Sequence, residues 1–68
     1  MNRIYEVRYT YNDDYENYKS FETESRLEAE SVYSSIIDFA HNNGIQYEIA
    51  LYEKDWSYIK GERNGMTV

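Results

Sequence analysis

Cysteine and proline are absent from this 68-residue sequence, and glycine occurs only three times. Without cysteine no disulfide can form, and with a single histidine the usual Cys/His zinc sites are excluded. Without proline, internal repeats or a low-complexity linker, nothing marks a domain boundary. We therefore predict one small domain, residues 1–61, and a flexible C-terminal tail, residues 62–68, which carries few anchoring side chains and, with Gly61 just before it, lies in a stretch with two glycines.

The sequence also lacks an apolar stretch long enough to span a bilayer and the start typical of a secretory signal. We expect a cytoplasmic protein that does not bind membranes. Basic residues are few as well: seven Lys and Arg stand against thirteen Asp and Glu, which gives a net charge of −6. Because nucleic-acid binding depends on clustered basic side chains, this balance argues against direct nucleic-acid binding.

What the sequence has instead is a segment rich in carboxylates and an excess of tyrosine. Residues 13–30 contain only Lys19 and Arg26 as basic residues. The acidic residues of the same segment are Asp13, Asp14, Glu16, Glu22, Glu24, Glu28 and Glu30. Nine tyrosines occur in the whole chain, and tyrosine is enriched at protein interfaces because it offers a large, rigid contact area. The same residue also fills small sheets, so we expect about half of the tyrosines to serve the core.

Alternating side chains predict strands over residues 3–11, 15–23 and 45–53, and a fourth strand over 56–60 whose register the pattern leaves open. Asn12, Asp13 and Asp14 supply turn chemistry between the first two strands. The second strand alternates poorly and is typical of a sheet edge.

The period changes to that of a helix at Ser25. Ser25 and Glu28 match the capping box, in which each side chain accepts a backbone N–H of the other residue. Apolar residues then recur at intervals of three and four, and Gly44 follows two asparagines where the pattern ends, as at many helix C-termini. The apolar face consists of Ala29, Val32, Tyr33, Ile36, Phe39 and Ala40.

The order of these elements predicts an α+β fold, ββαββ, with a four-stranded antiparallel sheet in the order 2-1-3-4 and one helix packed on one face. In this arrangement Tyr5, Val7, Tyr9 and Phe21 face the helix. Tyr18 and Tyr52 lie on the uncovered side.

No motif with a defined chemistry is present. The cluster Asp13-Asp14-x-Glu16 lacks the glycine and the spacing of a calcium loop, so a solvated turn is the favoured interpretation over a metal site. His41 falls at the predicted helix end, where helix-end stabilisation is favoured over a role as catalytic base. We predict no catalytic residues, no cofactor and no metal, and hence no enzyme.

An exposed aromatic sheet face can stack RNA bases, but the acidic surroundings and the missing consensus argue against this use. In size and acidity the chain resembles small accessory proteins of bacteriophages and prophages, some of which inhibit host or defence proteins. We therefore predict a protein-interaction module that inhibits a partner by occluding its basic, nucleic-acid-binding groove. The alternative is a structural homodimer with a small-ligand pocket between the subunits. The predicted partner-binding residues are Asp13, Asp14, Glu16, Tyr18, Glu22, Glu24, Glu28, Glu30, Tyr52 and Tyr58.

Overall fold

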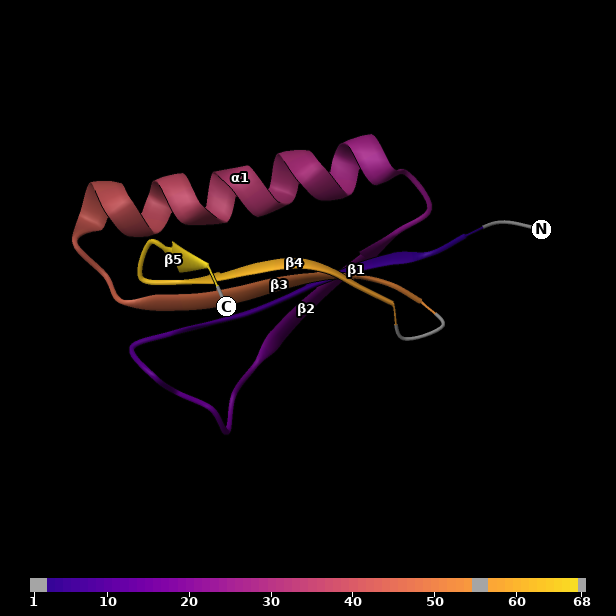
Figure 1. Cartoon of the computed structure of the whole chain (residues 1–68). Helices are drawn as coiled ribbons and strands as arrows, with labels where there is room; N and C mark the ends of the chain where they lie inside the picture. Colours follow the sequence, from indigo (N-terminus) through magenta and orange to yellow (C-terminus); the bar gives the residue numbers. More distant parts are fainter. Residues whose placement is uncertain (1–2, 55–56, 68) are drawn as a thin grey trace.

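The computed structural model describes residues 3–54 and 57–67 and confirms the predicted architecture. Helix α1 (Arg26–Asn43) lies across one face of an antiparallel sheet (Figure 1). The sheet contains β1 (Tyr5–Tyr11), β2 (Lys19–Thr23), β3 (Tyr47–Glu53), β4 (Ser57–Arg63) and β5 (Met66–Thr67). Its order is β2-β1-β3-β4-β5, so the predicted order of the first four strands is confirmed and a short fifth strand is added.

The core lies between α1 and the two central strands. The buried apolar residues are Tyr5, Val7, Ala29, Tyr33, Ile36, Ala40, Tyr47, Ile49 and Leu51. Tyr9 and Phe21 are partly buried and pack against this cluster, so the strand residues predicted to face the helix do contact the core. Of the predicted helix face, Phe39 remains 50% exposed and lies at the flank of α1, with its ring centroid 5.7 Å from that of Tyr11.

Both ends of α1 follow from local sequence chemistry. The N–H of Glu28 donates to Ser25 Oγ at 3.1 Å, so the predicted cap is present. The reciprocal half of the capping box differs: Ser25 N–H donates to Thr23 Oγ1, and the Thr23 hydroxyl in turn donates to the Glu28 carboxylate. Gly44 ends the helix with φ of 62°, a left-handed conformation that glycine adopts without steric cost.

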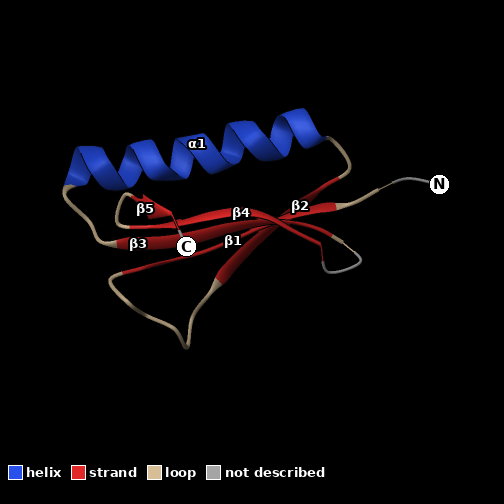
Figure 2. Cartoon of the chain, in the orientation of Figure 1, coloured by secondary structure: helices blue, strands red, loops and turns tan. Residues whose placement is uncertain are grey.

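The second strand is shorter than predicted, because residues 12–18 form a loop (Figure 2). Asn12 and Asp13 have positive φ, and the N–H of Asp14 donates back to the Tyr11 carbonyl oxygen at 3.1 Å. The Asn17 side-chain amide donates to both carboxylate oxygens of Asp14. These local hydrogen bonds compete with strand pairing, which is why pairing with β1 begins only at Lys19.

The end of the chain also differs from its predicted boundary. Glu62 and Arg63 belong to β4, and Asn64 and Gly65 both have positive φ between Arg63 and Met66, as in a two-residue type I′ hairpin turn. The Asn64 side chain accepts a hydrogen bond from Tyr47 N–H at 2.7 Å and thereby joins this hairpin to β3. The described part of the predicted tail is therefore strand and turn.

The other strand boundaries shift by a few residues. β3 begins at Tyr47, because the N–H of Ile45 is used by the helix end, where it donates to the Ala40 carbonyl oxygen at 2.9 Å. β4 runs from Ser57 to Arg63 and thus beyond the predicted residues 56–60; Trp56 lies outside the described residues. An irregularity between Leu51 and Tyr52 shifts the β3–β4 register, which explains why the alternation breaks in this region.

Candidate functional site: a tyrosine-lined hollow on the open sheet face

The face of the sheet opposite α1 carries a hollow of about 510 Å³. The segments that form it are β1, β3, β4 and the end of the 12–18 loop, so residues far apart in sequence meet there. Its lining includes Arg8, Tyr18, Glu48, Ala50, Tyr52 and Tyr58. The prediction that Tyr18 and Tyr52 lie on the uncovered side is confirmed by this shared lining.

Small residues in the middle of the sheet give the hollow its depth. Ala50 pairs with Arg8 on one side and with Gly61 on the other. The Tyr58 ring lies over Gly61, since a Cβ atom built at Gly61 would be only 2.6 Å from the Tyr58 hydroxyl. The Tyr52 ring meets the Tyr58 ring edge to face, with centroids 5.7 Å apart. One wall of the hollow is therefore a pair of packed phenol rings.

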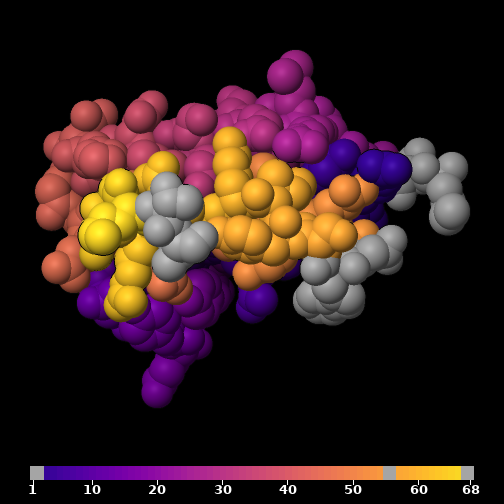
Figure 3. All heavy atoms as spheres, in the orientation of Figure 1, coloured from indigo at the N-terminus to yellow at the C-terminus, as the bar shows by residue number. Residues whose placement is uncertain are grey.

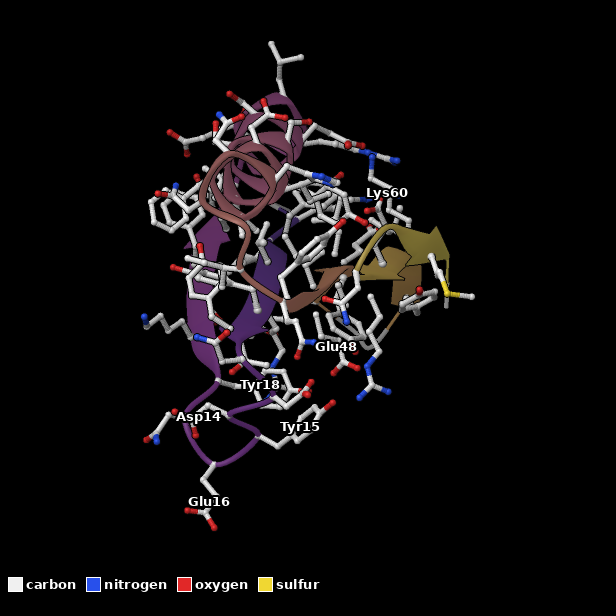
Figure 4. All side chains as sticks on the ribbon, turned by 90° about the vertical axis from the view of Figure 1, so that its left-hand side faces the viewer. Asp14, Tyr15, Glu16, Tyr18, Glu48 and Lys60 are labelled. Carbon is white, nitrogen blue, oxygen red and sulfur yellow. The ribbon has the colours of Figure 1, made fainter. Side chains whose placement is uncertain are left out.

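The opposite wall comes from the 12–18 loop, which extends away from α1 and projects from the body of the molecule (Figures 1 and 3). Tyr15 and Tyr18 stand side by side here, with ring centroids 6.0 Å apart, and both lie near Glu48 (Figure 4). The Tyr18 hydroxyl donates a hydrogen bond to the Glu48 carboxylate. Arg63 links the wall to β4, because it contacts the Tyr15 hydroxyl and lies 3.7 Å from Glu48.

The hydrogen bond to Glu48 raises the pKa of Tyr18 to about 12, and partial loss of water contact adds to the effect. Because the folded-state pKa lies above the ordinary value of 10.0, the stabilisation from this bond is complete below pH 10 and disappears as the pH rises through about 12. We therefore expect the difference between the tyrosinate absorbance titrations of the wild type and Tyr18→Phe to have its midpoint near pH 12.

The variant Glu48→Gln is the matched control, because it keeps the shape of the acceptor and removes its charge. It should move the Tyr18 midpoint back toward 10. Circular dichroism at each pH establishes that the chain is folded during the titration. A Tyr18 midpoint near 10 in the folded wild type would contradict the bond between Tyr18 and Glu48.

Arg8 is a functional candidate that the sequence analysis did not single out. Five of the seven basic residues form ion pairs: Arg3, Arg26, Lys54, Lys60 and Arg63. Among the described residues, Arg8 and Lys19 form none and instead lie over tyrosine rings, Arg8 at 5.7 Å from the Tyr18 centroid. The alternation of β1 places Arg8 opposite the core face, and this was the signal that could have identified it.

The predicted carboxylates do not form one continuous surface. Asp13, Asp14 and Glu16 lie in the 12–18 loop beside Tyr15 and Tyr18, and Glu16 is at its tip (Figure 4). The others lie beyond the far end of this loop, on β2, before α1 and on α1: Glu22, Glu24, Glu28 and Glu30. The 12–18 loop and the start of α1 lie at opposite ends of β2. The length of this strand therefore separates the carboxylates of the loop from those near the helix.

Several of these carboxylates already have partners within the chain. Glu22 pairs with Lys54 at 2.6 Å, and Asp13 lies 3.6 Å from Arg63. Glu30 pairs with Lys60 at 2.5 Å, and this hydrogen bond lowers the pKa of Glu30. In contrast, Asp14 and Glu16 form no ion pair with any described residue, so their charge is available to a partner.

His41 lies in the last turn of α1, as predicted. Its ring packs near that of Tyr47, with Nε2 at 3.4 Å from the tyrosine hydroxyl, and this hydroxyl donates to Glu62 at 2.5 Å. Burial raises the pKa of Tyr47, so the hydroxyl remains a donor over the ordinary pH range. The cluster connects the helix end to β3 and β4.

Within the described part of the chain, no three His, Cys, Asp or Glu side chains gather closely enough to hold a metal ion. No helix in the described ranges combines the length and apolar character needed to cross a bilayer. Comparison with known proteins adds no family: no family model matches the chain, and no curated protein or solved structure is significantly similar to it.

Proposed function

We propose that this chain is a non-enzymatic protein-interaction module that docks a partner protein on the open face of its sheet. The observation that carries the proposal is the gathering of Tyr18, Tyr52 and Tyr58, from three separate segments, around one hollow. An apolar side chain of the partner occupies the hollow, and basic side chains of the partner meet the carboxylates of the 12–18 loop. The partner surface is therefore basic around an apolar anchor.

The tyrosine walls suit this role because they are held in place before binding. Tyr18 is fixed by its bond to Glu48, and Tyr52 and Tyr58 are fixed against each other. Side chains that are already ordered lose little conformational entropy when a partner docks, so more of the contact energy appears as affinity. A hollow with packed aromatic walls also resembles the pockets that receive anchor residues at the centre of protein interfaces.

Charge directs which surface docks. The net charge of −6 attracts a basic partner, and Asp14 and Glu16, which form no ion pair with a described residue, lie in the same loop as Tyr18, with Glu16 projecting from its tip (Figure 4). A groove that normally holds nucleic acid has the required basic character. Docking there would exclude the nucleic acid, so the proposed biological effect is inhibition by occlusion, as in the small accessory proteins that the chain resembles in size and acidity.

A homodimer with a ligand pocket between subunits was the alternative predicted from sequence, and it remains a prediction. The hollow described above is formed within a single chain, so no second subunit is needed to complete it. The groups in the hollow also favour binding over catalysis. Its carboxylate, Glu48, already accepts a hydrogen bond from the Tyr18 hydroxyl and lies 3.7 Å from Arg63, so it is engaged within the chain.

Affinity capture from native host cells tests the proposal with three baits. The wild type should retain a specific protein at low salt and release most of it at high salt. Tyr58→Ala removes one wall of the hollow and should abolish retention. The double variant Asp14→Asn with Glu16→Gln keeps side-chain shape and should retain several-fold less of the same protein.

Matched controls separate these effects from general damage. Leu27→Ala removes an exposed apolar side chain from α1, and Asp38→Asn removes an exposed carboxylate from the same helix. Both controls should retain the partner like the wild type. A protein retained equally by wild type and Tyr58→Ala, or equally at both salt concentrations, would contradict the proposed surface, and so would capture of no specific protein.

A further inference from the structure

β2 is an edge strand whose outer side has no partner among the described residues. It pairs only with β1, over the register from Tyr5 opposite Thr23 to Tyr9 opposite Lys19. The backbone N–H and C=O groups on the outer side of such a strand are a ready template for another strand. At the other end of the sheet, the edge is the two-residue strand β5, which offers much less to pair with.

The devices that usually protect an edge are weak in β2. The chain has no proline, and the β1–β2 pairing contains no bulge. The one lysine, Lys19, is the first residue of the strand, and its ammonium lies 5.4 Å from the centroid of the Tyr11 ring in the same chain. At the centre of the strand, Ser20 and Phe21 carry no charge, and the one central carboxylate, Glu22, is paired with Lys54 of the same chain.

Symmetry limits how two copies could pair through this edge. If both helices lie on the same side of one continuous antiparallel sheet, the two-fold axis is perpendicular to that sheet. It then passes beside one residue of β2, which faces the same residue of the other copy, and all facing pairs of side chains lie on the same side of the sheet. An axis at Glu22 brings two carboxylates directly opposite each other, which destabilises the pair. An axis at Ser20 or Glu22 also leaves some residues of each β2 strand without a facing residue in the other β2 strand. Only an axis at Phe21 pairs all five residues of the strand, Lys19–Thr23.

The register centred on Phe21 is self-complementary. Phe21, already partly buried, faces its own symmetry mate, and each Ser20 faces the Glu22 of the other copy. Lys19 faces Thr23, so no like charges are opposed. Next to this edge, on the helix side, Phe39 is 50% exposed and contacts Tyr11. The edge thus carries aromatic surface that a second copy would partly cover.

We propose that a second copy of this chain pairs with β2 in antiparallel fashion about a two-fold axis at Phe21, so that the two sheets become one continuous sheet. Both hollows then lie on the same face of the dimer and remain open. The occupant of the edge is another copy and not an extended peptide, because pairing about Phe21 gives every residue of β2 a facing residue and brings no like charges opposite each other. This inference does not depend on the proposed function, since it uses a different surface.

The dependence on salt concentration distinguishes this dimer from the proposed complex with a basic partner. Each copy carries a charge of −6, so the copies repel each other and raised salt should strengthen the dimer. The same change should weaken binding of a basic partner. Light scattering after size exclusion, over a series of protein and salt concentrations, should therefore show a mass that rises toward twice that of the chain. A monomer at every concentration and salt would overturn the inference.

Two substitutions at Ser20 test the register. Under an axis at Phe21, Ser20→Lys places an ammonium opposite each Glu22 of the other copy and should tighten the dimer several-fold, whereas Ser20→Glu should weaken it. Under an axis at Ser20, both variants would oppose like charges and both would weaken it. Ser20 also donates to Glu6 of its own chain, so circular dichroism melting is needed to establish that both variants fold.

The absence of cysteine allows a direct second measurement. Ser20→Cys and Glu22→Cys are exposed single variants, and after mixing in equal amounts and mild oxidation the mixed disulfide between them should form well above the share that random pairing gives, which is about half of all disulfides. Ser34→Cys, on the exposed surface of α1, is the control and should show no preference in the same mixture. The mixture expected from random pairing, or a preference for the Ser20→Cys homodimer, would overturn the proposed register.

Discussion

Replacement of Leu51 by alanine should lower the free energy of unfolding by about 2–5 kcal/mol, the usual cost of deleting a buried leucine side chain. Leu51 is 0% exposed and lies on the helix-facing side of β3, between Val7 of β1 and Lys60 of β4. Truncation at this point opens a cavity at the centre of the core. The surrounding strands are hydrogen-bonded on both sides and cannot collapse into it fully.

The loss is large relative to what a domain of this size possesses, roughly 3–5 kcal/mol in total. A substantial fraction of Leu51→Ala molecules should therefore be unfolded at room temperature. Urea titration followed by circular dichroism measures the effect in both proteins.

Leu27→Ala is the matched control because it deletes the same atoms from a side chain that is 84% exposed. It should change stability by less than about 0.5 kcal/mol. If the two alanine variants were equally stable, α1 would not pack on the sheet as described.

Replacement of Gly61 by alanine should cost about 1–3 kcal/mol, the typical penalty for inserting a methyl group into a filled space. The added Cβ would lie 2.6 Å from the Tyr58 hydroxyl and 2.9 Å from the Ile49 carbonyl oxygen. Tyr58 can swing away, but the carbonyl belongs to the neighbouring strand and cannot. The substitution should thus both destabilise the sheet and move Tyr58 out of the wall of the hollow.

A double-mutant cycle with Tyr58→Ala separates the two effects. With the ring already removed, Gly61→Ala should cost less, and the remaining cost measures the clash with the β3 backbone. Chemical denaturation of the four proteins supplies the cycle. Equal costs in both backgrounds would show that the ring does not rest on Gly61, and the described wall of the hollow would then be wrong.

Much of the fold could be predicted because its signals are local. The start of α1 is set by Ser25, whose hydroxyl accepts the Glu28 N–H, and its end by Gly44 in a left-handed conformation. Alternation of side chains assigned the core faces of β1 and β3. Two hairpins joined by one helix then leave few ways to arrange four strands, so the order 2-1-3-4 followed.

The errors came from turns. Residues 15–18 alternate weakly, and nothing in that pattern revealed that Asp14 and Asn17 would organise a loop through their own hydrogen bonds. The pair Asn64-Gly65 is a strong signal for a two-residue hairpin turn, and it was interpreted as part of a tail. A turn signal only produces a hairpin if the second strand finds a partner, and β4 provides one.

The candidate site was predicted in part. Tyr18, Tyr52 and Tyr58 were named as partner-binding residues and line the same hollow, whereas Arg8, Glu48 and Ala50 were not named. The acidic residues were treated as one segment because they are neighbours in sequence. In space, β2 divides them, and some pair with Lys54 from the turn after β3 or with Lys60 and Arg63 from β4.

The sequence by itself determined the helix, its caps and the alternation of β1 and β3, because each depends on residues a few positions apart. It also determined the net negative charge, which depends on composition alone. Only the tertiary structure decided which tyrosines meet and which carboxylates are paired. These outcomes depend on cross-strand register, where a shift of two residues exchanges every neighbour while leaving the local pattern of apolar and polar side chains unchanged.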